Sequence, residues 1–275
     1  MNGSLRQKRA RQVLAILRLE LRKTFLAKRA IPFYLLAILP VLLFTGQAVA
    51  ALFLRDKVEL SFAVNTFGAV FQTFFLRASI FFGCVIVFAN LIRGEVLDKS
   101  LHYYFLSPVR REVLVVGKFL AGLVATSVVF SAATTVSFLL NYVPLGRAMA
   151  LDHMLRGPGL GQLFWYLVVT VLACLGYGAV FLAIGLLFKN PMIPALVILG
   201  WESINFLLPP LLKRISVLCY LQSLCPFQLP QGTVGILADP VPAWLAVPGL
   251  CLVTVALLAL SGWRVRRFEI SYGAE

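Results

Sequence analysis

The chain has 275 residues, of which 60% are hydrophobic and 13% are charged, and its mean hydropathy is +0.91. This composition leaves too little polar surface to cover a water-soluble core, so it excludes a soluble globular protein and indicates an integral membrane protein. The net charge of +14 could suggest nucleic acid as a partner. The basic residues lie at the ends of apolar runs rather than in one solvated patch, so we expect no nucleic-acid partner.

The first element that the sequence predicts is an amphipathic elbow helix at about residues 5–28. It has an apolar face with Leu14, Leu17, Leu21 and Phe25 and a basic face with Arg11, Arg18 and Arg22. A helix of this kind lies at the membrane interface, where its arginines meet anionic headgroups, so membrane lipid is an expected partner. A basic anchor that only sets the topology is the alternative.

Six apolar runs are long enough to cross a bilayer, because a hydrocarbon core of about 30 Å needs roughly 20 helical residues. They predict membrane spans at about 31–54, 62–92, 115–143, 160–188, 191–212 and 242–263. Runs of this length satisfy their backbone hydrogen bonds as helices rather than as barrel strands. The predicted fold is an all-α integral membrane protein with one transmembrane domain over residues 1–275.

A further uncharged segment at about 215–238 precedes the last predicted span and contains Pro226 and Pro230. A seventh span would place the basic C-terminal sequence on the outer side, so we expect an outer re-entrant segment. An ordinary external loop is the alternative. Cys219 and Cys225 lie in this segment, where two buried thiols are expected and a disulfide is possible.

The distribution of Lys and Arg predicts that both termini are cytoplasmic. With that orientation, 18 of these residues lie inside, in 1–30, in 93–118, at Lys189 and in 264–267, and 6 lie outside. The positive-inside rule favours this arrangement, in the cytoplasmic (inner) membrane. The first apolar run is longer than the apolar region of a signal peptide, so we expect no cleavage there.

A charged stretch, GEVLDKSLHYYFLSPVRREVLVVGK, separates the second and third predicted spans. Ser107 and Pro108 form a helix-start signal, since a serine can cap the helix and proline fits its first turn. Residues 95–105 before it are predicted to form a short amphipathic turn at the membrane surface. This loop could contact a cytoplasmic partner, or it could be a solvated loop with aromatic anchors.

The stretch resembles the cytoplasmic signature of ABC-2 type permeases, the membrane subunits of one class of ATP-binding cassette exporters. That signature has an acidic residue, a small or polar pair, a hydrophobic run, Pro-Val, arginine and Gly-Lys. The matching positions are Glu95, Lys99 and Ser100, residues 101–106, Pro108 and Val109, Arg110 and Arg111, and Gly117 and Lys118. The commoner Gly-Thr pair is replaced by Lys99-Ser100. The order of elements is similar to that family over nearly the whole chain.

The resemblance implies a permease subunit that exports a substrate with ATP hydrolysed by a separate nucleotide-binding ATPase subunit, which also holds Mg. A second permease chain, identical or homologous, would complete the pore. The residues expected to couple to the ATPase are Glu95, Asp98, Lys99, His102, Pro108, Arg110 and Arg111. For the last two arginines, lipid phosphates are the alternative partner.

The residues themselves predict no enzyme and no cofactor in this chain. Gly117-Lys118 lacks the upstream glycine of a phosphate-binding loop. No spacing suggests a metal-ligand cluster or a nucleophile with its base. A secondary transporter, or another polytopic membrane protein without an ATPase partner, is the alternative function, although no internal repeat is visible.

Arg77 and Glu202 are charged residues inside predicted spans. A central charge costs about 2.5–3.5 kcal/mol on insertion scales, so each should face protein or water. Their opposite signs suggest a pair, and both are candidates for the transport pathway or its gate. The alternatives are that Arg77 reaches the outer headgroups and that Glu202 is a protonated, hydrogen-bonded packing residue.

Overall fold

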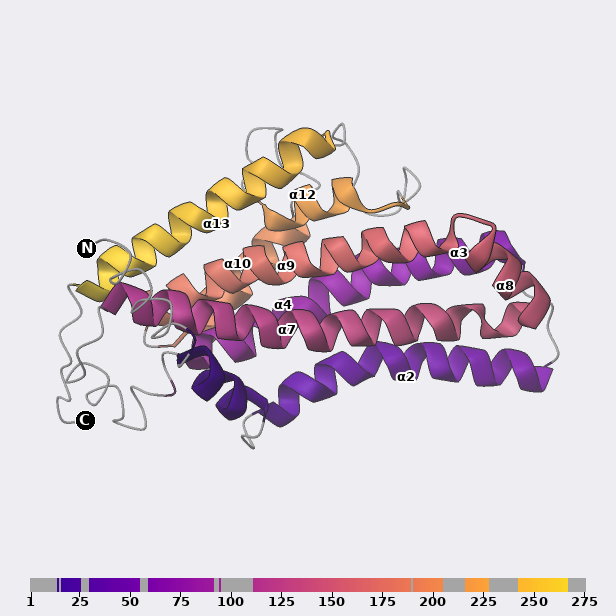
Figure 1. Cartoon of the computed structure of the whole chain (residues 1–275), viewed down its shortest axis with the longest axis horizontal. Helices are drawn as coiled ribbons and strands as arrows, with labels where there is room; N and C mark the ends of the chain where they lie inside the picture. The colour runs from indigo at the N-terminus through magenta and orange to yellow at the C-terminus, as the bar shows by residue number, and fades with distance from the viewer. Residues whose placement is uncertain are drawn as a thin grey trace.

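The computed structural model describes residues 14, 16–25, 30–54, 59–91, 94, 111–188, 190–204, 216–227 and 242–266. All regular structure in these ranges is helical, and five helices within them are long and apolar enough to cross a membrane. The chain is therefore an all-helical, multi-pass membrane protein, as its composition predicts. Four of the five helices lie roughly along the longest axis of the molecule, and the last crosses them obliquely (Figure 1).

The membrane-spanning helices begin and end within four residues of the predicted bounds. They are α2 (Ile31–Leu54), the second span, α7 (Arg111–Tyr142), α9 (Gly159–Leu187) and α13 (Ala243–Arg266). The second span is continuous but has four parts, α3 (Leu60–Val70), η2 (Phe71–Ile80), α4 (Phe81–Cys84) and η3 (Val85–Ala89). The η2 and η3 parts are π-helical, with a wider turn than an α-helix. Nothing in the sequence pattern predicted this wider turn.

The shorter helices connect the spans or lie beside them. The turn η4 (Val143–Leu145) and the helix α8 (Arg147–Leu155) join α7 to α9, while α10 (Met192–Ile204) and α12 (Val217–Leu224) follow α9. Gly146 lies between η4 and α8 with a φ of 84°. Residues with a side chain rarely adopt this backbone angle, so glycine permits the sharp turn at this end of the bundle.

The fifth of the six predicted spans is only partly within the described residues. There α10 has 13 residues, which at about 1.5 Å each reach roughly 20 Å, less than the hydrocarbon core. Residues 205–215 lie outside the described ranges, so the span at 191–212 stays a prediction. The segment predicted at 215–238 is described up to 227, and it contains α12.

The core is formed mainly by the second span, α7 and α9, which are more buried than α2 and α13. A cluster of aromatic rings packs these helices together near the loop that holds α8. The Phe67 ring lies 5.0 Å from Phe138 and 4.9 Å from Tyr166, both edge-on, and Phe71 lies 4.7 Å from Tyr166. Such edge-on and tilted contacts stabilise aromatic pairs beyond the area that they bury.

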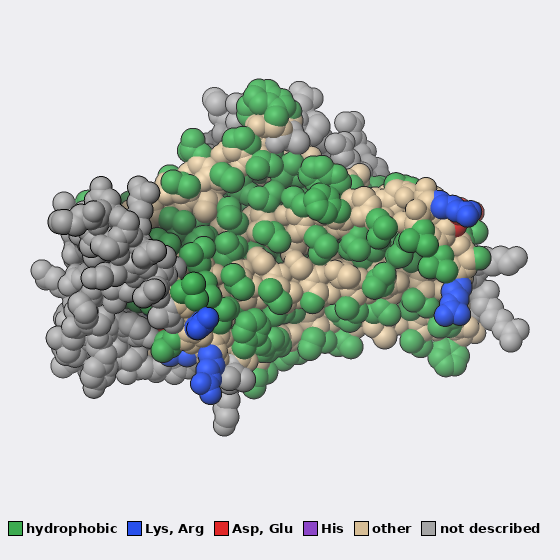
Figure 2. Space-filling model, in the orientation of Figure 1, with side chains coloured by type: hydrophobic (Ala, Val, Ile, Leu, Met, Phe, Trp, Pro, Cys, Tyr) green, Lys and Arg blue, Asp and Glu red, His purple; other side chains and the backbone are tan. Residues whose placement is uncertain are grey.

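The surface has the distribution of side chains that is expected of a protein surrounded by lipid. Hydrophobic side chains cover the body of the bundle, and Lys and Arg side chains gather near its two ends (Figure 2). The large exposed side chains of α2 include Leu35, Leu42 and Phe53, and those of α13 include Leu252 and Val255. In water such a surface would aggregate, whereas acyl chains cover it at no cost.

Candidate functional site

A buried polar cluster lies among the second span, α9 and α10. The Tyr177 hydroxyl donates a hydrogen bond of 2.8 Å to Oε2 of Glu202. Tyr177 is fully buried and Glu202 is 3% exposed. The backbone of Leu218, at the start of α12, adds a favourable interaction with the carboxylate. Four elements therefore meet around one acidic side chain. A buried carboxylate needs such neighbours, because it is stable only with hydrogen-bond partners.

Arg77 belongs to the same cluster but makes no direct ion pair with Glu202. Its positive charge acts favourably on the Glu202 carboxylate. The ion pairs within 4.0 Å that the described residues form do not include these two. The buried Nε of Arg77 also has no hydrogen-bond partner in this part of the structure. The two charges that the sequence singled out therefore interact across a distance rather than by contact, and Tyr177 is the residue that holds Glu202.

Arg77 lies in η2, the longer π-helical part of the second span. A π-helical turn bonds each N–H to the carbonyl five residues back, and in proteins it occurs often at functional sites. An ionisable residue at membrane depth is itself a functional signal. The two observations are independent, because one concerns the backbone and the other the side chain.

The fully exposed side chains of the second span are mostly polar, and together with Arg77 they are called its polar face. Asn65, Thr73 and Asn90 are exposed, and Phe62 is the one large hydrophobic residue of this span that is equally exposed. Arg77 is half-buried, as are the apolar Phe74, Phe82 and Ile86. Thr73 satisfies its hydroxyl with the carbonyl of Ala69 at 2.7 Å. This face differs from the apolar faces of α2 and α13, and it suits water or a polar partner better than lipid.

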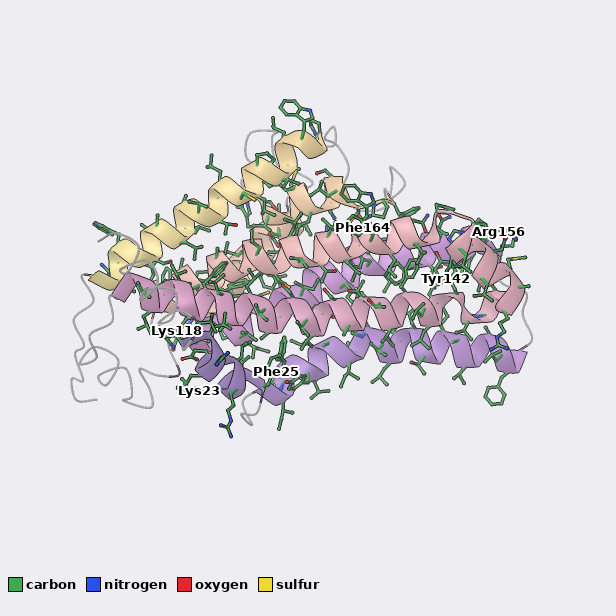
Figure 3. The ribbon with its side chains drawn as sticks, viewed as in Figure 1. Lys23, Phe25, Lys118, Tyr142, Arg156 and Phe164 are labelled. Atoms are coloured by element: carbon green, nitrogen blue, oxygen red, sulfur yellow. The ribbon has the colours of Figure 1, made fainter. Side chains whose placement is uncertain are left out.

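A second polar site lies at the other end of the bundle from α8, where the N-terminal helix, described over residues 16–25, meets α7. Lys118 is 1% exposed, and its Nζ lies 2.9 Å from Oε1 of Glu20 and donates a bond of 2.8 Å to the carbonyl of Leu91. Glu20 is 3% exposed, and Lys23 lies 4.0 Å from the same Oε1 atom. Figure 3 shows Lys118 beside the helix that carries Lys23 and Phe25.

Two glycines of α7 allow close packing at this second site. A side-chain carbon on Gly117 would lie 2.9 Å from Cγ2 of Ile16, and one on Gly122 would lie 2.7 Å from the ring of Phe88. Both distances are too short for real carbon atoms. Gly117 and Lys118, which belong to the motif described above, therefore have a structural role, and the contact between Lys118 and Glu20 is one that sequence reasoning missed.

The coupling residues predicted from the sequence mostly lie outside the described ranges. These are Glu95, Asp98, Lys99, His102, Pro108 and Arg110. Arg111 is the first residue of α7, and the placement of its side chain is not described. The described ends that flank this loop are Leu91 and α7, and both take part in the site around Lys118.

At the end near α8, the segment after α9 and α10 returns to the second span. The side-chain amide of Gln72 donates a hydrogen bond to the carbonyl of Phe227, and the Phe227 ring lies against Gly68. Cys225 is a buried thiol, as expected, and donates to the Leu221 carbonyl at 3.4 Å, whereas Cys219 is a thiol that is only half-buried. Burial raises the pKa of the Cys225 thiol to about 12.

Neither a metal site among the described residues nor a known relative indicates the function of the chain. Within the described ranges, no group of three or more His, Cys, Asp or Glu side chains is placed to hold a metal ion. A comparison of the sequence with protein-family models and with curated proteins found no match. The function must therefore be argued from the two polar sites and the sequence itself.

Proposed function

We propose that this chain is the permease subunit of an ABC-2 type ATP-binding cassette transporter. It exports a substrate across the cytoplasmic membrane with energy from ATP that a separate nucleotide-binding subunit hydrolyses. The observation that carries the proposal is the site around Lys118. There the N-terminal helix, the end of the second span and the start of α7 meet at the base of the charged loop.

This meeting point is what an externally driven transporter needs. A partner that pushes on the loop can move the membrane helices only if the loop ends in well-packed elements rather than in a flexible linker. Leu91 and Gly117 flank the loop, and both pack closely against neighbouring helices. The charges at Glu95, Asp98, Lys99 and His102 would contact the ATPase, and Arg110 and Arg111 would bind its acidic groups or lipid phosphates.

The finer architecture belongs to the same proposal. Five spans are described, and the sixth would consist of α10 and the residues that follow it. The N-terminal helix would be the elbow helix at the cytoplasmic interface, and the segment that contains α12 would be re-entrant from the outer side. Two permease chains would pair about an axis along the membrane normal, with both termini of each in the cytoplasm.

The substrate path would follow the polar face of the second span. Asn65 and Thr73 are exposed on this face and Arg77 is half-buried on it. Glu202 and Tyr177 hold a second helix close to Arg77, so a shift of α10 would change the surroundings of the arginine. In this proposal Arg77 and Glu202 line or gate the path.

A secondary transporter without an ATPase is the second candidate. The observation that favours it is the buried Tyr177–Glu202 pair beside Arg77, since ionisable clusters in membranes also carry coupling ions. That candidate gives no role to the charged loop. The two functions therefore differ in what the loop must do.

The test is to purify the chain from its host with a mild detergent and to identify a bound ATPase that has a phosphate-binding loop. The ATPase is then purified alone, and its hydrolysis rate is measured with and without the permease in lipid vesicles. We expect the permease to bind it and to change the rate. Binding with no change in hydrolysis, or no bound ATPase under cross-linking, would favour the secondary transporter.

The matched variants reverse two acidic charges at each end of the molecule. Glu95→Lys with Asp98→Lys should release the ATPase or abolish its response to the permease. The control, Glu59→Lys with Asp152→Lys, makes the same charge change near α8, where both residues are exposed. It should leave ATPase binding intact. Equal loss in both variants would show that net charge, rather than the loop, is responsible.

A further inference from the structure

Lys118 is buried and bonded in a way that is unusual for a lysine near the membrane interface. Its ammonium group is almost fully buried, bonds to Glu20 from the N-terminal helix at 2.9 Å, and bonds to the Leu91 carbonyl at 2.8 Å. A lysine near a membrane interface usually extends to water. Here the chain loses the hydration of two charges, so the contact persists only because the geometry compensates for that loss.

The Leu91 contact ties Lys118 to the end of the second span. Leu91 lies two residues after η3 and is helical. The last carbonyls of a helix have no partner within the helix and carry its negative dipole end, and a lysine satisfies both. Lys118 of α7 thus bonds to a carbonyl near the end of the described part of the second span and places its positive charge there.

The N-terminal helix docks through a face that its apolar pattern does not include. Ile16 contacts Gly117 and Glu20 contacts Lys118, and these two residues are one helical turn apart. Arg18, Arg22 and Lys23 remain exposed. The helix is therefore held in one rotation about its axis, with Arg18 and Arg22 exposed and Lys23 reaching back to Glu20 at 4.0 Å.

We infer that Lys118 is a positioning residue that fixes the N-terminal helix to the adjoining ends of the second span and α7, so that the three segments move as one body. This contact set, Glu20, Leu91 and Lys118 with Gly117 against Ile16, is called the Lys118 junction. Its role in coupling rests on the proposed function, whereas its mechanical role does not. The competing explanation is that the ion pair only adds stability to the fold.

A covalent replacement separates these two explanations. A carbon on Gly117 would lie 3.2 Å from Cβ of Ile16. A disulfide joins β-carbons about 3.5–4.5 Å apart, so Ile16→Cys with Gly117→Cys can form one after a small outward shift. This bond would hold the N-terminal helix to α7 without any charge at position 118.

The first measurement is hydrogen–deuterium exchange of residues 16–25 in lipid nanodiscs. Lys118→Met should raise exchange there by at least about tenfold, because the helix opens locally without global unfolding. The oxidised cysteine pair in the Lys118→Met chain should restore slow exchange, and reduction should reverse the effect. Arg156→Met, which removes an exposed contact of 3.7 Å to Asp152 at the other end, is the control and should change nothing at residues 16–25.

The second measurement addresses coupling alone. With the partner ATPase present, Lys118→Met should abolish the response of hydrolysis to the permease, and the oxidised cysteine pair should restore it. If exchange behaves as expected but coupling does not, the junction stands and the proposed function fails. If exchange at residues 16–25 is unchanged in Lys118→Met, or if the disulfide does not restore it, the junction is not the mechanical link and this inference is wrong.

A variant with a smaller defect keeps the test decisive if Lys118→Met does not fold. Glu20→Asp shortens the acid by one methylene group and keeps both charges. It should raise exchange at residues 16–25 by less than Lys118→Met, and the same oxidised cysteine pair should suppress the rise. Exchange in Glu20→Asp equal to that of the unsubstituted chain would also overturn the inference.

Discussion

The Tyr177 hydroxyl donates a 2.8 Å hydrogen bond to the Glu202 carboxylate in the interior of a membrane protein, and both side chains are almost fully buried. An unpaired carboxylate in such a place would lose its hydration and gain nothing in exchange. The pair links α9 to α10, two helices that otherwise touch little. The bond therefore adds a specific link for α10 to its apolar packing, in which Ala195 is buried and Ile198 and Leu199 lie against the core.

Tyr177→Phe should destabilise the protein by about 1–3 kcal/mol, because it leaves a buried acceptor without its donor. The apolar ring contacts with Phe81, at 5.3 Å, would remain. Glu202→Gln keeps an acceptor for the hydroxyl and should cost less. Thermal unfolding in detergent would measure both, and a larger loss in Glu202→Gln than in Tyr177→Phe would contradict this account of the pair.

Arg77→Gln or Glu202→Gln alone should damage transport-linked ATPase activity more than the double variant. Each single change leaves one charge of the cluster without the opposite charge that acts on it. The measurement is a double-mutant cycle on activity and on thermal stability. Losses that simply add would show that the two charges act independently.

Thr73→Cys should react with a water-soluble maleimide in intact membranes, and Leu42→Cys should not. Both positions are exposed in the middle of a span, but Thr73 lies on the polar face of the second span and Leu42 on the apolar face of α2. The thiolate that reacts requires water around it. Equal labelling, corrected for the unsubstituted chain, would mean that the polar face does not line a hydrated path.

Gly68→Ala should loosen the segment at residues 216–227 and cost about 1–3 kcal/mol, as overpacking does. The added carbon would lie 2.3 Å from the Phe227 ring and would disturb the hydrogen bond from Gln72. Gly46→Ala is the control, since nothing lies within 4 Å of its added carbon. Faster hydrogen exchange at 216–227 in Gly68→Ala alone is the expected result, and unchanged exchange would contradict the contact.

Cys225 should resist alkylation at pH 8 until the protein is unfolded. Burial raises its pKa from 9.0 to about 12, so it has about a thousandfold less of the reactive thiolate than an ordinary cysteine. The folded state thus favours the protonated thiol. The free energy of unfolding falls only as the pH rises above 9, because the unfolded chain then loses this proton before the folded protein does. Labelling before and after addition of dodecyl sulfate, read by mass spectrometry at Cys225, checks the reactivity, and thermal unfolding at pH 8 and pH 10 checks the loss of stability. Rapid labelling of the folded protein would contradict the burial.

The spans could be predicted from the sequence because, in lipid, the secondary structure of a segment depends on the residues of that segment alone. Every backbone group in hydrocarbon must find its partner within the same helix, so the length of an apolar run sets the helix. The predicted bounds 31–54 and 160–188 accordingly lie within one residue of α2 and α9. Arg77 and Glu202 could be singled out for the same reason, since a charge in an apolar run stands out by itself.

The contacts around those residues were decided only by the tertiary structure. Glu20 and Lys118 are 98 residues apart, and Tyr177 and Glu202 belong to different helices, so each pair depends on how whole helices rotate and slide against one another. Residues 16–25 are helical, as the sequence predicted, but the pattern of Leu14, Leu17 and Leu21 did not reveal that Ile16 and Glu20 would face α7. Apolar periodicity records which face avoids water. The partner of a buried charge is set by packing between distant segments, and a single sequence does not encode it in any local pattern.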